Sequence, residues 1–192
     1  MTETENARSS EIERIRRVAD QLCTAHAALR DRFASRQSAI DIVVLLLSAW
    51  TASMGFVDPR LTPWLTPPHL DAQLWIGILG SITFGLALIQ FKADWRGRSE
   101  AHKRSFTMYS EVKREAGYLL ANLGKVSDRD FQRLADRYDM ASDVGAGVPE
   151  KDFLKLKRRH KLKVAISRIL DEKPGSSLWL IKLKLLLRDN YK

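Results

Sequence analysis

Two uninterrupted apolar runs dominate the pattern of hydrophobic and polar positions along the chain. The first extends from Ile40 to Val57 and contains one ionisable residue, Asp41, next to its start; the second extends from Leu74 to Phe91 and contains none. Each run has 18 residues, which as a helix spans roughly 27 Å, close to the hydrocarbon thickness of a bilayer. A helix on the surface of a soluble protein would carry a polar face. Neither run has one, so the pattern predicts two membrane-spanning helices.

The alternative interpretation places the two apolar helices in the buried core of a soluble protein. A core that covers two helices of this length on all sides needs a larger protein around it than a chain of 192 residues supplies. The mean hydropathy of −0.25 does not favour this alternative, because it averages two apolar runs with very polar flanks. We therefore expect a transmembrane hairpin over residues 38–91, with spans at about 40–57 and 74–91 and an outer loop at 58–73.

Positive charge near the two spans predicts the orientation of the hairpin, because cytoplasmic flanks are enriched in Lys and Arg. Arg60 is the only Lys or Arg in the loop between the spans. The flanking segments are basic on both sides, with Arg30, Arg32 and Arg36 before the first span and Lys92, Arg96, Arg98, Lys103 and Arg104 after the second. Both termini are therefore expected in the cytoplasm and the loop outside.

Residues 1–37 are predicted to form a cytosolic amphipathic helix that begins at Ser10 after a frayed end. Ser10 and Glu13 have the spacing of a capping box. Mostly apolar residues recur at alternating spacings of three and four, which forms a seam along one side of the helix. The seam consists of Ile12, Ile15, Ala19, Leu22, His26, Leu29 and Phe33. Such a seam packs either on another subunit or on later helices of the same chain. His26 fits a tolerated seam residue better than a pH switch.

The cytoplasmic end of the first span carries two charged residues, Arg36 and Asp41. Ser38 and Asp41 repeat the spacing of a serine and an acid at a helix start, which favours Asp41 as a cap near the lipid headgroups. The other interpretation places Asp41 in a ring of carboxylates at the inner mouth of a pore, with Arg36 nearby.

Small residues form a strip on each span. In lipid there is no hydrophobic driving force that brings helices together, so helices associate mainly through close packing. Small residues allow that close approach. The two strips are expected to pack within the hairpin, to pack between subunits or to line a pore; they comprise Ser48, Thr51 and Gly55 in the first span and Gly77, Ser81 and Gly85 in the second.

Residues 92–192 are predicted to form a basic cytosolic helical region. We expect a helix from about Glu100 to Leu123 with Gly124 following it, and a second helix that begins at Ser127 and ends near Tyr138 or Met140. A loop at 144–149 and two further helices complete the region. The predicted fold class is therefore all-α, with an N-terminal amphipathic helix, a two-helix transmembrane hairpin and a C-terminal cytosolic helical bundle.

Positive charge is concentrated in residues 150–192, which contain 13 Lys and Arg against five Asp and Glu. Its densest part is a basic cluster formed by Lys155, Lys157, Arg158, Arg159, His160, Lys161 and Lys163. Three interpretations compete for this cluster: contact with anionic lipid headgroups, a solvated helix face, and binding of a phosphate-bearing ligand or nucleic acid. Nucleic acid is the least favoured, because no aromatic residues are interleaved with the charges.

Catalytic, metal and cofactor sites are not predicted. Cys23 is the single cysteine, and the four histidines are too scattered along the chain to form a local set of ligands. The sequence contains no glycine loop of the kind that cradles phosphate and no nucleophile paired with a base on an adjacent turn. We therefore expect a protein that is not an enzyme and that uses no cofactor.

The order of these parts resembles the SLATT family, whose members are two-transmembrane effector domains associated with SMODS and SLOG domains. The resemblance is carried by a helix of the form W-x-x-R…A-H…F-x-x-Y…V-x-R-E-x-x-Y, by Tyr138 and Asp139, by the Val-Pro pair before Phe153, and by the segment from Lys157 to His160. In this chain the helix motif comprises Trp95, Arg98, Ala101, His102, Phe106, Tyr109, Val112, Arg114, Glu115 and Tyr118.

The resemblance implies a membrane effector of a bacterial nucleotide-signalling or antiviral defence system, located in the inner membrane. Such an effector forms a homo-oligomer and an ion-conducting pore, and it responds to a nucleotide second messenger or to a partner protein that senses one. The alternative from the residues themselves is a membrane-tethered scaffold, which binds an anionic partner or a nucleotide through the basic C-terminal helices.

Overall fold

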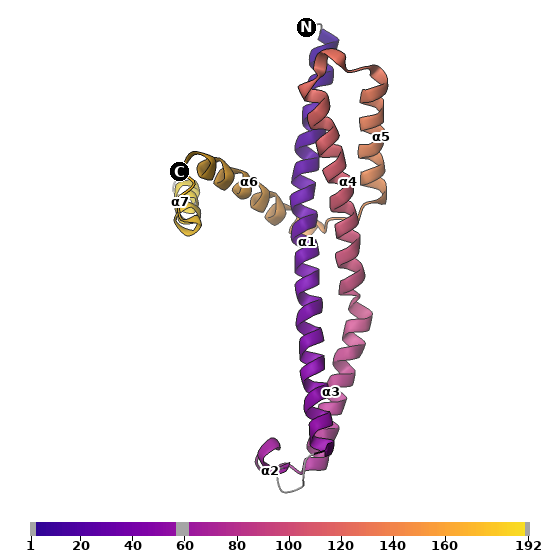
Figure 1. The fold of residues 1–192 in the computed structure, drawn as a ribbon, viewed down its shortest axis with the longest axis vertical. Coiled ribbons are helices and arrows are strands. Elements are labelled where there is room, and N and C mark those ends of the chain that lie inside the picture. The colour runs from indigo at the N-terminus through magenta and orange to yellow at the C-terminus, as the bar shows by residue number, and fades with distance from the viewer. Residues whose placement is uncertain (1–2, 57–61, 191–192) are drawn as a thin grey trace. The chain divides into compact units, whose positions relative to one another are not determined.

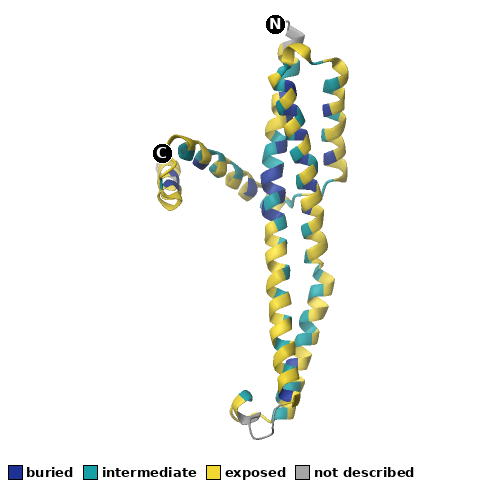
Figure 2. Cartoon of the chain, in the orientation of Figure 1, coloured by how far each residue is buried: buried dark blue, intermediate teal, exposed yellow. Residues whose placement is uncertain are grey.

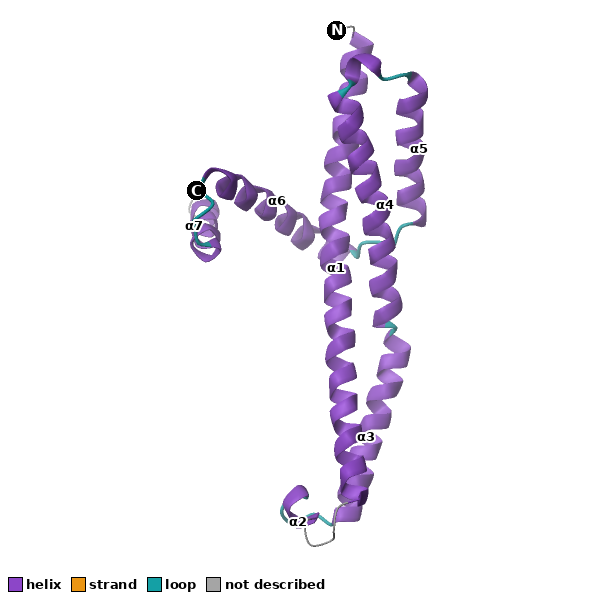
Figure 3. Ribbon diagram, viewed as in Figure 1, coloured by secondary structure: helices purple, strands orange, loops and turns teal. Residues whose placement is uncertain are grey.

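A computed structural model of the chain describes residues 3–56 and 62–190. These residues form helices joined by short loops, with no strand among them, which confirms the all-α prediction (Figures 1 and 3). The chain divides into two compact units, Met1–Ala28 with His102–Lys192 and Leu29–Ala101. The predicted end of the first span at Val57 lies outside the described residues, and so do residues 58–61 of the outer loop, which include Arg60.

Helix α1 extends without interruption over Glu3–Phe56. The predicted starts at Ser10 and at Ser38 are therefore wrong. Neither glycine nor proline occurs between Glu3 and Met54, so nothing in this segment breaks the helix. Ser10 lies inside the helix, where its hydroxyl donates a hydrogen bond to the carbonyl of Ala7 at 2.8 Å. A serine with an acid three residues later marks a helix start only where the preceding residues are not helical.

In the described part of the connection to the next long helix, α2 spans Thr62–Leu65 and a turn follows it. The carboxylate of Asp71 caps α3, which spans Ala72–Ala93. Asp94 ends α3 in the left-handed conformation, with φ 42°. Helix α4 begins at the next residue and spans Trp95–Ala121, because the Asp94 carboxylate accepts a hydrogen bond from the backbone N–H of Gly97 at 3.1 Å. The predicted start near Glu100 is therefore about one turn late.

The segment after α4 differs from the expected glycine stop. Helix α4 ends at Ala121, and Gly124 lies inside a short 3-10 helix, Leu123–Lys125. Helix α5 then spans Asp128–Val144 and begins with the predicted capping box, in which Ser127 and Asp130 satisfy each other's backbone N–H. It continues one turn beyond the expected end at Met140. Helices α6 at Glu150–Glu172 and α7 at Leu178–Asn190 complete the chain.

The seam of the N-terminal helix forms the core of the first unit. Ile12, Ile15 and Ala19 are buried against residues of α4 and α5 (Figure 2). The partners on those helices are Tyr109, Val112, Ala116, Leu119, Leu134 and Ala141. Of the two alternatives for the seam, packing on later helices of the same chain is the one observed.

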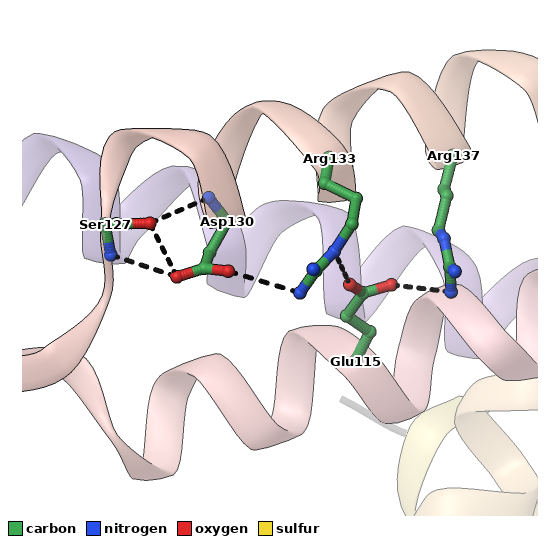
Figure 4. A network of polar contacts seen from close by, with 5 residues as sticks. All are labelled: Glu115, Ser127, Asp130, Arg133 and Arg137. Carbon is green, nitrogen blue, oxygen red and sulfur yellow. Dashed lines mark hydrogen bonds and ion pairs between the residues drawn. The ribbon is translucent and has the colours of Figure 1, made fainter.

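A polar network holds α5 against α4 on the exposed side of this core (Figure 4). The carboxylate of Glu115 accepts hydrogen bonds from Arg133 at 2.9 Å and from Arg137 at 3.0 Å. Arg133 also forms an ion pair with Asp130 at 3.2 Å, which links the network to the capping box at Ser127. Because Glu115 is largely shielded from water, its two pairs are screened less than ordinary surface pairs.

Candidate functional site

The two long helices of the second unit expose many large apolar side chains to their surroundings. In α1 and α3 the 18-residue windows of highest hydropathy are only 6% buried. Phe56 and Phe91 are 92% and 87% exposed. Other large apolar side chains on these two helices are also exposed, namely Ile42, Val43, Leu45, Leu46, Trp50, Leu74, Ile82, Phe84, Leu88 and Ile89 (Figure 2). Both helices are long and apolar enough to cross a membrane, and the soluble-core alternative is not supported, because the described residues do not cover them.

The small-residue strips do not form close contacts within the described chain. Thr51 and Gly85 are half-buried, whereas Ser48, Gly77 and Ser81 are exposed. A methyl group added to Gly55, Gly77 or Gly85 would meet no atom within 4 Å. The serine and threonine hydroxyls are satisfied locally, since Ser81 donates to the Gly77 carbonyl and Thr51 to the Leu47 carbonyl. Much of this small, weakly polar surface is therefore open to lipid or to another subunit.

Asp41 connects α1 to α3 through Gln90, and it also bonds to Gln37 on its own helix. Its carboxylate accepts a hydrogen bond from Gln37 at 2.8 Å and another from Gln90 at 2.6 Å. It therefore does not cap a helix start, which corrects the favoured interpretation. Gln90 and Gln37 are the partners that the sequence analysis missed. They line a cavity of about 430 Å³ with Ala34, Ser38, Asp41, Arg96, Ser99 and Glu100. Arg36 is exposed and is not among the lining residues.

The basic cluster on α6 separates into two groups. Lys155, Lys157, Arg158, Arg159 and Lys163 are exposed. His160 differs, because it is half-buried and its Nδ1 lies 2.9 Å from the hydroxyl oxygen of Thr24 on α1. His160 and Lys161 line a larger cavity, whereas the other five residues do not. The sequence predicted one continuous cluster, but the helix directs its members to different surroundings.

That larger cavity lies between α1, α4 and α6 and has a volume of about 650 Å³. We refer to it as the three-helix cavity; it is lined by Glu13, Arg16, Arg17, Asp20, Gln21, Lys113, His160, Lys161, Val164, Ala165 and Arg168. Sequence reasoning missed the α1 and α4 residues. A usable signal exists, since Glu13, Arg17 and Asp20 recur at helical spacing beside the seam, as do Lys161 and Arg168 on α6.

The first unit also buries a pair of histidines. His26 on α1 and His102 on α4 are 1% and 5% exposed, and their Nδ1 atoms lie 3.0 Å apart. The ring of His26 stacks on Tyr109 with a centroid distance of 5.5 Å. Burial lowers the pKa of both imidazoles, and the charge of His102 lowers that of His26 further, to about 4. Both rings are therefore neutral at physiological pH.

Among the described residues, no group of three or more His, Cys, Asp and Glu side chains is placed to hold a metal ion. Comparison with protein-family models, with curated proteins and with solved structures finds no match to this chain.

Proposed function

We propose that the chain is an integral membrane protein whose spanning segments in α1 and α3 form a transmembrane hairpin, and that several copies assemble into an ion-conducting pore. The observation that carries this proposal is the uncovered apolar surface of both helices. Leaving so many large apolar side chains in water would be strongly unfavourable, whereas lipid and neighbouring spans provide an apolar surrounding.

Oligomerisation follows from the number of spans. Two helices do not enclose an aqueous path, so conduction requires several copies around a common axis. The strips at Ser48, Gly55, Gly77 and Ser81 support contacts between subunits, because no atom of the described residues 3–56 and 62–190 occupies the space beside the glycines. Asp41, exposed near the predicted cytoplasmic end of the first span, would then influence ion preference.

The basic flanks of the two spans support a topology with both termini in the cytoplasm. The SLATT resemblance supports the same topology and adds a biological role, which is depolarisation of the bacterial inner membrane in response to a nucleotide-linked signal. Under this proposal α4 to α7 form a cytosolic helical bundle that receives the signal.

Ion flux from proteoliposomes containing the purified protein tests the proposal. We expect flux above that of empty vesicles, and we expect Ser81→Leu to reduce it severalfold, because a larger side chain on the strip disturbs subunit packing or narrows the path. Ala87→Leu is the matched control, since it makes a similar change at an exposed position on another face of α3. Equal loss in both variants would count against the strip, and protein that stays in the supernatant without detergent would refute the membrane assignment.

The second candidate function is a membrane-tethered scaffold. It is favoured by the exposed part of the basic cluster, in which none of Lys155, Lys157, Arg158, Arg159 and Lys163 forms an ion pair with a described residue. This function predicts that neutralising these residues abolishes recruitment of an anionic partner while Ser81→Leu has no effect. A pore predicts the opposite result, in which Ser81→Leu impairs function and neutralising the basic residues does not. The same two sets of variants therefore distinguish the two functions.

A further inference from the structure

The three-helix cavity concentrates positive charge from helices that are far apart in sequence. Its lining contains five Lys or Arg residues, one histidine and two carboxylates. Lys113 is neutralised, because its ammonium group lies 2.7 Å from the carboxylate of Asp20. The remaining four cations form no ion pair with a described residue; they are Arg16 and Arg17 on α1 and Lys161 and Arg168 on α6.

Like charges facing one cavity from two helices repel each other, and only one carboxylate of the lining, that of Glu13, is left to offset them. An anion in the cavity would reverse this repulsion and attract both α1 and α6. Arginine is the side chain best suited to such an anion, since its planar fork forms two parallel hydrogen bonds to phosphate or carboxylate oxygens. Three of the four unpaired cations are arginines.

The size and the remaining lining restrict the ligand further. A cavity of about 650 Å³ lies within the usual range for small-molecule sites, which is about 300–1,000 Å³, and exceeds what a single inorganic phosphate fills. Val164 and Ala165 are half-buried in its wall and offer an apolar contact for an organic group. The ring of His160 is held by Thr24 at 2.9 Å, so one wall of the cavity is fixed to α1.

We propose that the three-helix cavity binds a small organic ligand that carries two or more phosphate groups, with Arg16, Arg17, Lys161 and Arg168 contacting the phosphates. A soluble nucleotide and a phosphorylated lipid headgroup share this chemistry. The cavity belongs to the unit whose described residues are 3–28 and 102–190, and the inference does not depend on conduction, because its test measures binding alone.

The experiment uses the full chain in nanodiscs of zwitterionic phosphatidylcholine, titrated calorimetrically with ATP and with pyrophosphate. We expect saturable binding that weakens with added salt. The double variant Arg16→Gln with Arg168→Gln is expected to weaken binding about tenfold or more, since it removes two charge-assisted contacts. The control is Lys151→Gln with Lys182→Gln, which lowers the net charge by the same amount at exposed positions of α6 and α7 outside both the cavity and the basic cluster; it should change the affinity less than about twofold.

Two further measurements keep the result interpretable. Arg168→Lys retains the charge and the helix propensity but removes the fork, so it should fold and still bind more weakly than the parent chain, which separates recognition from misfolding. Repeating the titration in nanodiscs that contain cardiolipin, an anionic lipid with two phosphate groups, distinguishes the sources of phosphate. Competition by the anionic lipid, abolished by the Arg16 and Arg168 substitutions, would assign the cavity to a headgroup, and unchanged affinity would assign it to a soluble ligand.

Absence of saturable binding of both probes, in nanodiscs with no anionic lipid, would overturn the proposal. Equal weakening by the cavity variant and by the control variant would overturn it as well, because it would show a general charge effect rather than a site. Neither result would bear on ion flux, so failure of this inference is distinguishable from failure of the pore.

Discussion

The Nδ1 atom of His26 lies 3.0 Å from the Nδ1 atom of His102, with both rings almost completely buried. A hydrogen bond between two Nδ1 atoms needs one donor and one acceptor. One ring must therefore carry a proton on Nδ1, whereas the Nδ1 of the other ring is unprotonated and accepts the hydrogen bond. The two histidines are 76 positions apart in sequence, and they join α1 to α4 next to the stacked ring of Tyr109.

Acid is expected to destabilise the first unit through this pair. Burial, followed by the charge of His102, lowers the pKa of His26 to about 4, whereas an unfolded histidine titrates near 6.5. The unfolded chain therefore binds the proton first as the pH falls. The contribution of His26 to the free energy of unfolding is therefore fully present above about pH 6.5 and is lost as the pH falls from about 6.5 to 4. This contribution is at most roughly 3 kcal/mol.

Thermal unfolding in detergent at pH 7.5 and pH 5 measures this effect. The decrease in Tm at pH 5 should become smaller in His26→Gln, which keeps a hydrogen-bonding group without the titration. His69→Asn is the control, since His69 is exposed in a loop, and it should leave the decrease unchanged. An identical decrease in all three proteins would show that the pair does not contribute.

Cys23 is expected to resist alkylation in the folded chain. Its side chain is buried on α1, and burial is the main reason that the pKa of its thiol is raised to about 11. Because the thiolate is the reactive form, labelling by a maleimide at pH 8 should be about a hundredfold slower in the native chain than in urea. Intact-mass analysis over time gives both rates.

The control for this labelling is Ser10→Cys in a Cys23→Ala background, which presents a thiol at an exposed position of the same helix. That variant should label at similar rates with and without urea. Rapid labelling of native Cys23 would mean that α1 separates readily from Phe106, whose carbonyl lies 3.9 Å from the thiol sulfur.

Removing the Glu115 carboxylate is expected to loosen α5. Glu115→Ala deprives Arg133 and Arg137 of a shared, largely shielded partner, and the free energy of unfolding should decrease by about 1 kcal/mol, since both guanidinium groups remain hydrated. Glu111→Ala is the control, because Glu111 is exposed on the same helix and has no ion pair with a described residue. Equal effects of the two substitutions in denaturant titrations would contradict a network at Glu115.

The Gln90 to Asp41 contact is expected to stabilise the association of α1 with α3. Gln90→Leu removes the donor on α3, whereas Asp41 keeps its bond from Gln37. Interhelical hydrogen bonds of membrane proteins contribute about 0.6 kcal/mol on average, so a decrease in Tm of a few degrees is expected in detergent. Gln73→Leu, at an exposed position near the start of α3, should have a smaller effect; a larger one would contradict the assignment.

Local features of the fold were predictable from the sequence. The two apolar runs correspond to the apolar segments of α1 and α3, and the capping box at Ser127 and Asp130 is present. Each depends on residues within a few positions of one another, because helical hydrogen bonds and caps join near neighbours in the chain. The same reasoning failed at Ser10 and Ser38, where a local signal for a helix start occurs in the interior of α1, which continues from Glu3 to Phe56.

The sequence by itself therefore determined the helical content, the positions of the apolar runs and the concentration of positive charge near the C-terminus. Only the tertiary structure decided that His26 meets His102, that His160 meets Thr24, and that Arg16 and Arg168 face one cavity. The physical reason is that contacts between helices depend on the rotation and the axial position of each helix. Those two quantities are set by the packing of many side chains together, such as Ile12, Val112 and Leu134 in the core, and no short stretch of sequence contains them.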